Sequence, residues 1–299
     1  MIITLTAIIS ALTLLGLSKK LWFFTIFDFF RIQYAFVSVI LIFISIYYAN
    51  YFLCAVNFTL ILINLYRIRH FLPRPWVKPS YTSKTLMSVN AYDKNNDLSK
   101  LTAAIDIFDP EILLIMEVTE KLHLKLKDVF ARYPYKLETP VRDGFRICLL
   151  SRHPMKNDAI THHGDSDSPL IKADFDIKGK KFTVFSGHPK PAFNKKWDDD
   201  RHAYFSEIEK IISNTPKPKI IMGDFNSVPW ERHFVSFLKN TGMKSTLIDH
   251  GYKVTWPSYF LPMGIPMDHI LISDDINYTD LTVGPNVGSD HYPISLDII

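Results

Sequence analysis

Residues 219–226 read Lys-Ile-Ile-Met-Gly-Asp-Phe-Asn, an apolar run that ends in a glycine followed by short polar side chains. A short apolar run bounded by a turn signal is typical of a buried β-strand. Asp224 and Asn226 would then stand at the end of that strand, where α/β proteins build their functional sites. The structural alternative is an Asx turn that lets the chain leave the strand.

The same pattern recurs along the chain. Strands are also predicted over 85–89, 112–116, 145–150, 171–175, 181–186, 268–272 and 292–298. Five of these runs have a polar residue at or beside one end: Asn90, Glu117, His188, Asp268, and the pair Asp290 and His291. Helical patterns cover 98–108, 119–130, 197–212 and 230–239, so the order of elements predicts a layered α/β domain.

Residues 1–72 are a different kind of sequence. They contain three apolar runs, at 2–17, 34–49 and 51–66, with a proline-rich linker at 73–80 before a domain at 81–299. Runs without a polar face favour three transmembrane helices over buried core helices. A cleaved signal peptide is disfavoured for the first run because no Lys or Arg precedes it. The sequence therefore predicts an integral membrane protein that contacts the lipid bilayer.

The placement of Lys and Arg predicts the orientation of these helices. Residues 18–33 and 67–78 carry basic side chains and would lie on the same side, which the positive-inside rule makes cytoplasmic. Residues 1–80 hold seven basic and one acidic residue, which leaves 81–299 with 27 basic and 29 acidic residues and a net charge of −2. This balance does not favour a nucleic-acid partner, whose phosphates call for a basic excess.

Each polar strand-end residue also has a structural explanation. Glu117 could cap the next helix, His188 could be a buried structural histidine, and Asp290 could be a turn residue. The complete set, one Glu, three Asp, two Asn and two His, favours a functional site instead. Mg²⁺ prefers oxygen ligands and takes one or two carboxylates together with substrate phosphate, whereas the spacing does not suit zinc.

Several motifs of this domain resemble the endonuclease/exonuclease/phosphatase superfamily, also called DNase I-like. They occur in the superfamily's order: Ser88-Val89-Asn90, Ile115-Met116-Glu117, Gly223-Asp224-Phe225-Asn226, Met267-Asp268-His269 and Gly288-Ser289-Asp290-His291. The resemblance implies a four-layer α/β sandwich, here preceded by the three predicted membrane helices. It also implies Mg²⁺-dependent hydrolysis of a phosphoester, with Mn²⁺ as an alternative ion.

The resemblance assigns a role to each strand-end residue. Glu117 looks like the main metal ligand with Asn90 beside it, and Asp290 like a further metal or supporting residue. The other residues look catalytic: His188 donating to the phosphate, Asp224 and Asn226 orienting water and phosphate, and His291 acting with Asp268 behind it. Whether Asp224 or His291 takes the proton from water stays open, and Asn95 or Asn96 could replace Asn90.

The three apolar runs and the segments 146–152 and 255–257 are also similar to the membrane-anchored teicoplanin-resistance proteins of bacteria. That likeness implies a phosphatase acting on a membrane lipid phosphate, with its domain outside the cytoplasm, in conflict with the Lys/Arg placement. The sequence-based prediction keeps the domain in the cytoplasm, at a bacterial plasma membrane. His162 to Asp167 is expected to be an exposed loop, and Lys190 and Arg201 are expected to be solvated.

Three hypotheses of function follow. The first is a membrane-anchored, Mg²⁺-dependent phosphoesterase that hydrolyses a phosphate ester or diphosphate, with a phosphorylated lipid as a natural substrate. The second is a membrane-tethered nuclease. The third is an inactive membrane scaffold, which the complete set of site residues disfavours.

Overall fold

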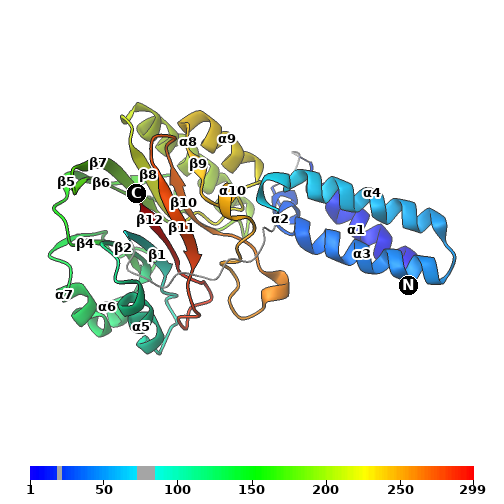
Figure 1. Cartoon of the computed structure of the whole chain (residues 1–299), viewed down its shortest axis with the longest axis horizontal. Coiled ribbons are helices and arrows are strands. Elements are labelled where there is room, and N and C mark those ends of the chain that lie inside the picture. The colour runs from blue at the N-terminus through cyan, green and yellow to red at the C-terminus, as the bar shows by residue number, and fades with distance from the viewer. Residues whose placement is uncertain (19–21, 73–84) are drawn as a thin grey trace.

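The computed structural model describes residues 1–18, 22–72 and 85–299, so the predicted linker at 73–80 lies outside the described residues. The chain forms an α/β body from which a helical arm projects (Figure 1). The arm is made of α1 (Ile2–Leu15), α3 (Arg31–Tyr47) and α4 (Tyr51–Arg67). Short α2 (Phe24–Phe29) and η1 (Arg69–Phe71) lie where the arm meets the body.

The body contains two six-stranded sheets. The first has the order β11 (Tyr278–Val283), β12 (Ile294–Ile298), β1 (Leu86–Asn90), β2 (Ile112–Val118), β4 (Arg146–Ser151) and β3 (Tyr135–Glu138). The second has the order β5 (Lys156–His163), β6 (Ser168–Ile177), β7 (Lys180–Gly187), β8 (Lys219–Asp224), β10 (Asp268–Ile272) and β9 (Lys244–Ser245).

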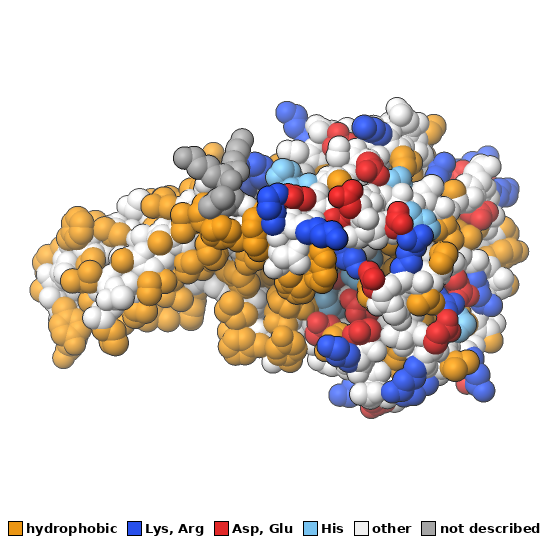
Figure 2. All heavy atoms as spheres, turned by 180° about the vertical axis from the view of Figure 1, so that it is seen from behind, with side chains coloured by type: hydrophobic (Ala, Val, Ile, Leu, Met, Phe, Trp, Pro, Cys, Tyr) orange, Lys and Arg blue, Asp and Glu red, His pale blue; other side chains and the backbone are white. Residues whose placement is uncertain are grey.

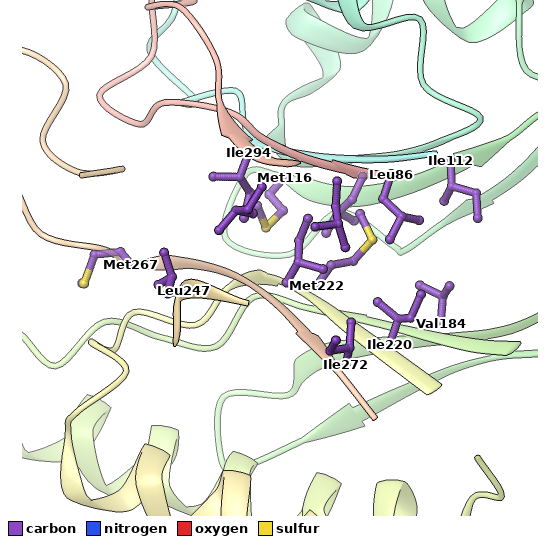
Figure 3. Packing of buried hydrophobic residues seen from close by; sticks show 14 of the residues in the cluster. Leu86, Ile112, Met116, Val184, Ile220, Met222, Leu247, Met267, Ile272 and Ile294 are labelled. Carbon is purple, nitrogen blue, oxygen red and sulfur yellow. The ribbon is translucent and has the colours of Figure 1, made fainter. Parts of the chain in front are cut away.

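Alternation along the central strands explains why the sheets are covered on both faces. In β2, Leu114 and Met116 point into the core between the sheets, whereas Leu113 and Ile115 belong to a separate core on the outer face. Successive side chains of a strand point to opposite faces, so a continuous apolar run must be buried on both. Figure 3 shows the inner layer, in which side chains of the two sheets face each other.

Helices cover the two outer faces and complete the predicted four-layer α/β sandwich. Helices α5 (Ser99–Phe108), α6 (Glu120–Lys125) and α7 (Lys127–Ala131) pack on the first sheet. Helices α8 (Lys195–Asn214) and α9 (Arg232–Thr241) pack on the second. The remaining short helices are α10 (Leu247–His250) and η2 (Leu261–Met263). The helix predicted at 119–130 is two short helices, because α6 ends at Lys125 and α7 begins at Lys127.

The prediction of three transmembrane helices, and with it that of an integral membrane protein, is wrong for this structure. No helix among the described residues is both long and apolar enough to cross a membrane. The apolar helices α1, α3 and α4 have 14, 17 and 17 residues. At 1.5 Å per residue the longer two measure about 25 Å, against a hydrocarbon core of about 30 Å.

The arm contains polar side chains between its helices. The side-chain amide of Asn57 donates to the hydroxyl of Thr6 over 3.1 Å, and the amide of Asn64 donates to that of Thr13 over 3.0 Å. All four residues are buried. These pairs fix how α1 lies against α4, because a shifted register would leave buried amides without partners.

A cluster of charged side chains lies at the base of the arm. The buried carboxylate of Asp28 accepts from Nε of Arg31 at 2.6 Å and from the Arg67 guanidinium at 3.0 Å. The backbone oxygen of Asp28 accepts from the indole N–H of Trp230, which belongs to the body. Phe29 is packed into the core between the sheets. The arm and the body are therefore joined by buried contacts.

Candidate active site

The pairing of the strands brings the predicted site residues to one edge of the two sheets. β1 and β2 are parallel, with Asn90 opposite Met116, so Asn90 and Glu117 end together. β7 and β8 are also parallel, with Gly187 opposite Gly223, which places His188 beside Asp224. The antiparallel strands β10 and β12 begin at the same edge, where Asp268 pairs with Asp224 and His291 precedes β12.

Two local irregularities of the backbone shape this edge. Glu117 has a positive φ of 56°, at a bulge where the register of β2 against β4 shifts. Such a bulge re-aims a side chain out of the regular alternation. At Gly223 a Cβ atom would come within 2.0 Å of the Gly187 carbonyl oxygen, so only glycine lets β7 and β8 approach closely here.

Asn90 links the two sheets. Its side-chain amide donates to Oε1 of Glu117 at 2.9 Å and to Oδ2 of Asp224 at 3.2 Å. Its oxygen accepts from the backbone N–H of Tyr92. Asn95, the alternative considered from sequence, instead donates to the backbone oxygen of Val287. The structure thus places Asn90, rather than Asn95, beside the carboxylates.

The carboxylate of Asp224 lies between two imidazoles. Its Oδ2 is 3.5 Å from Nε2 of His188 and 3.6 Å from Nε2 of His291. Burial opposes ionisation of Asp224, but the charge of His291 and the hydrogen bond from His188 hold the pKa of Asp224 well below its usual range. Asp224 is therefore an ionised carboxylate with two donors facing it.

Asp268 holds the second imidazole in place. Its Oδ2 is 2.8 Å from Nδ1 of His291, and both residues are buried. Burial would lower the pKa of His291, but the charges of Asp268 and Asp224 outweigh burial and raise it to about 10. Burial raises the pKa of Asp268. With Nδ1 bound to Asp268, Nε2 of His291 is the nitrogen that faces the site.

Asn226 and Arg201 form the floor beside Asp224. The backbone N–H of Asn226 donates to Oδ1 of Asp224 at 2.9 Å, and its side-chain amide donates to the backbone oxygen of Pro189. Arg201 was expected to be solvated, but it is fully buried, bonded to Asp198 and to the Asn226 backbone oxygen. It therefore supports the turn that positions Asn226 rather than facing a ligand.

A cavity of about 550 Å³ opens onto these groups. Glu117, His188, Asp224 and His291 line it, and so does Asp290, whose carboxylate accepts from the indole N–H of Trp256 at 3.2 Å. Burial raises the pKa of Asp290, and the charges of Glu117 and Asp224 add to this effect. Several carboxylates therefore converge on one end of the cavity.

This donor set fits a hard divalent cation. Glu117 and Asp290 offer carboxylate oxygens at the cavity surface, and oxygen ligands are the ones that such a cation prefers. Asp224, Asp268 and His291 also lie within 4.8 Å of one another. However, the last two already bind each other, and a protonated His291 repels a cation. We therefore favour Glu117 and Asp290, with Asn90 beside them, as the metal-holding residues.

A second group of potential ligands lies away from the cavity, at His202, Glu231 and His233. Both carboxylate oxygens of Glu231 accept backbone N–H groups at the start of α9, and the buried charge of Arg201 acts on Glu231. Helix capping and this cation account for Glu231 without a metal.

Comparison with known proteins agrees with this geometry. Residues 85–291 match the Endonuclease/Exonuclease/phosphatase family. The chain belongs to this family. Its described members are hydrolases of phosphoester bonds, and such enzymes typically use a divalent metal. No curated protein matches the sequence, and the resemblance to the teicoplanin-resistance subgroup stays a prediction.

Solved structures of low sequence identity share the fold of this family domain. They include a D. rerio TDP2 humanized by 14 mutations, with a TM-score of 0.59, 15% identity, and coverage of 72% of this chain and 98% of that chain. The human Nocturnin catalytic domain with bound sulfate has a TM-score of 0.54, 16% identity, and coverage of 72% and 94%. Sphingomyelinase C from Streptomyces griseocarneus has a TM-score of 0.51, 16% identity, and coverage of 72% and 98%.

Sequence reasoning missed residues that approach the family site from loops. Trp256 binds Asp290, and its ring centroid is 6.5 Å from that of His291. The ring of Phe145 is 5.7 Å from that of His188. Phe145 directly precedes β4 and Trp256 lies in a loop, and both are aromatic, so a pattern of polar residues at strand ends could not find them. His269, which follows Asp268, is buried and bonded to the Ser227 backbone oxygen, and burial lowers its pKa to about 4.

Proposed function

We propose that this family member is a divalent-metal-dependent hydrolase of a phosphate ester or diphosphate, with Mg²⁺ as the expected ion and Mn²⁺ as a substitute. The observation that carries the proposal is the arrangement of Asp268, His291 and Asp224 beside a cavity that Glu117 and Asp290 also line. Phosphoester hydrolysis needs an ionised acid, a cationic hydrogen-bond donor and ligands for a metal ion. Asp224, His291 and the pair of carboxylates supply these groups.

The residues of the chain have distinct tasks in this mechanism. Glu117 and Asp290 would hold the ion, which supplies positive charge to a phosphate oxygen when bound. His188 and His291 donate from Nε2 to the phosphate, and Asp268 keeps the His291 ring in its orientation. Asp224, ionised between the two imidazoles, orients the attacking water and takes its proton.

Asn226 has two roles in this hydrolysis, one through its backbone and one through its side chain. Its backbone N–H fixes Oδ1 of Asp224, so the other oxygen faces the imidazoles. Its side chain lines the cavity, where it can also contact the phosphate. Asn90 holds Glu117 and Asp224 at a set separation through its two hydrogen bonds.

The test measures hydrolysis of 4-nitrophenyl phosphate and bis(4-nitrophenyl) phosphate by the full chain. We expect turnover with Mg²⁺, loss in EDTA and recovery when Mg²⁺ is restored. His291→Ala should lower kcat by roughly 100-fold or more. His123→Ala is the matched control, because His123 also pairs with a carboxylate, Glu138 at 2.9 Å, on a different part of the surface.

Two results would contradict the proposal: equal turnover in EDTA, or a His291→Ala variant as active as His123→Ala. Plasmid DNA assayed under the same conditions distinguishes the nuclease hypothesis. Nicking that depends on His291 would assign the substrate to nucleic acid. Turnover of the aryl phosphates without nicking would favour a smaller phosphate ester.

A further inference from the structure

The cavity that holds the metal-type carboxylates and the two imidazoles is also lined by apolar side chains. Among them are Ile26, Phe29 and Phe30 from the base of the arm, together with Phe145, Trp256 and Met267 from the body. Phe145 and Trp256 lie beside His188 and His291. These apolar side chains form a hydrocarbon wall next to the charged groups.

The arm's part of this wall is firmly held. Phe29 is only 6% exposed and lies in the core between the sheets, and Phe30 packs against the same core. The preceding residue, Asp28, accepts the Trp230 indole N–H at 2.8 Å through its backbone oxygen. A second bond joins the start of α3 to the body, from the Gln33 side chain to the Gly264 backbone oxygen. The wall is thus a built feature of the folded chain.

The family domain does not supply this wall by itself. The family match covers residues 85–291, whereas the residues of α2 that line the cavity precede it. A wall that comes from outside the hydrolase fold affects which substrates enter rather than how the phosphate reacts. Its composition therefore indicates what the substrate carries besides phosphate.

We infer that the substrate is a phosphate ester or diphosphate whose substituent is a long hydrocarbon chain, held against α2. This inference rests on the proposed hydrolase function and specifies its substrate class. A hydrocarbon chain releases water from the apolar wall, which is favourable by about 25 cal/mol per Å². A sugar or nucleoside placed there would bury hydroxyl groups opposite Phe29 and Phe30 without partners, at a cost.

The test measures binding rather than turnover. Methyl-, butyl- and octylphosphonate are titrated into the full chain with Mg²⁺ by calorimetry, below their micelle concentrations. We expect Kd to fall by up to about fourfold per methylene, the factor that corresponds to about 0.8 kcal/mol. Phe30→Ala should weaken octylphosphonate by roughly tenfold and flatten the dependence on chain length. Phe193→Ala, at an exposed residue of the same cavity, should act in the same direction with no cost to folding.

Phe43→Ala is the matched control, because Phe43 is 70% exposed on α3 and does not line the cavity. An affinity independent of chain length would overturn the inference. So would an equal loss in Phe43→Ala and Phe30→Ala, which would place the alkyl chain on the arm's exposed surface. Aryl phosphate turnover without chain-length dependence would refute the hydrocarbon substrate and leave the hydrolase function standing. Chain-length dependence without any turnover would refute the hydrolase function alone.

Discussion

Replacing Asp268 by asparagine tests the site most directly. The change keeps the size of the side chain but removes the charge that accepts from Nδ1 of His291 at 2.8 Å. A hydrogen bond to a charged group contributes about 1.5–3 kcal/mol. If that bond holds His291 in its productive orientation in the transition state, kcat should fall roughly 10- to 150-fold. KM should change little, because Asp268 does not line the cavity.

The assay is aryl phosphate hydrolysis at saturating Mg²⁺, with thermal unfolding as a check that the variant is folded. Asp249→Asn is the control, because this exposed carboxylate also accepts a hydrogen bond, from the Tyr278 hydroxyl at 2.6 Å, away from the site. The double variant Asp268→Asn, His291→Ala should be no slower than His291→Ala, since Asp268 acts through His291. A kcat within threefold of wild type, or fully additive losses, would refute the assigned role of Asp268.

Three further predictions concern the metal, the arm and pH. Glu117→Gln should raise the Mg²⁺ concentration for half-maximal activity by at least about 10- to 100-fold, measured by titration of EDTA-treated protein; an unchanged midpoint would remove Glu117 from the metal site. Asp28→Ala should lower the free energy of unfolding in urea by about 3–5 kcal/mol because Arg31 is left buried without its partner. The surface change Asp106→Ala should cost within about 0.5 kcal/mol; similar losses in the two variants would contradict the role of the buried cluster. Burial opposes ionisation of Glu231, but nearby cations and N–H groups hold its pKa below 4.5 in the folded state. The Glu231 carboxylate therefore stabilises the fold above that pH, and this stabilisation is lost as pH falls through the lower folded pKa. The stability advantage of wild type over Glu231→Gln should therefore be present at pH 7 and shrink below about pH 4.5; a constant difference in denaturation from pH 7 to 3 would contradict this.

The strands that the sequence predicted are the interior strands of the two sheets. The four that it missed, β3, β5, β9 and β11, are the four edge strands of the two sheets. Residues of β5 are mostly exposed, so they give neither a continuous apolar run nor a strong alternation. His162 and His163, expected in a loop, lie at the end of this strand. An edge strand is specified by the neighbour it pairs with, which a local pattern does not contain.

The proximity of the candidate site residues followed from sequence because they stand at strand ends, where position alone predicts proximity. The cavity wall did not follow, because residues 22–30 lie within residues 1–72, which the sequence predicts to be a membrane region. Its packing against the body depends on contacts over long sequence separations, such as the bond from Trp230 to Asp28. The interior bonds of the arm, such as that from Asn64 to Thr13, likewise link residues 51 positions apart.

The exposed surface of the arm differs from that of the body. Apolar side chains cover much of the arm, whereas acidic and basic groups are scattered over the body (Figure 2). Phe36, Phe43 and Phe52 are among the large side chains exposed there. Isolated exposed apolar residues are normal, but a contiguous set is typical of an interaction surface.

The bridge that Asn90 makes between Glu117 and Asp224 has a consequence for how activity arises during folding. Glu117 belongs to one sheet and Asp224 to the other, and Asp268 and His291 are likewise divided between the second sheet and the entry to the first. Neither sheet alone holds a complete set of reacting groups. If the chain were split between β4 and β5, Glu117 would lie on one fragment and Asp224 on the other. Each fragment alone would be inactive, and activity would require the two fragments to associate. A folding intermediate in which the two sheets have not docked would therefore lack the complete site.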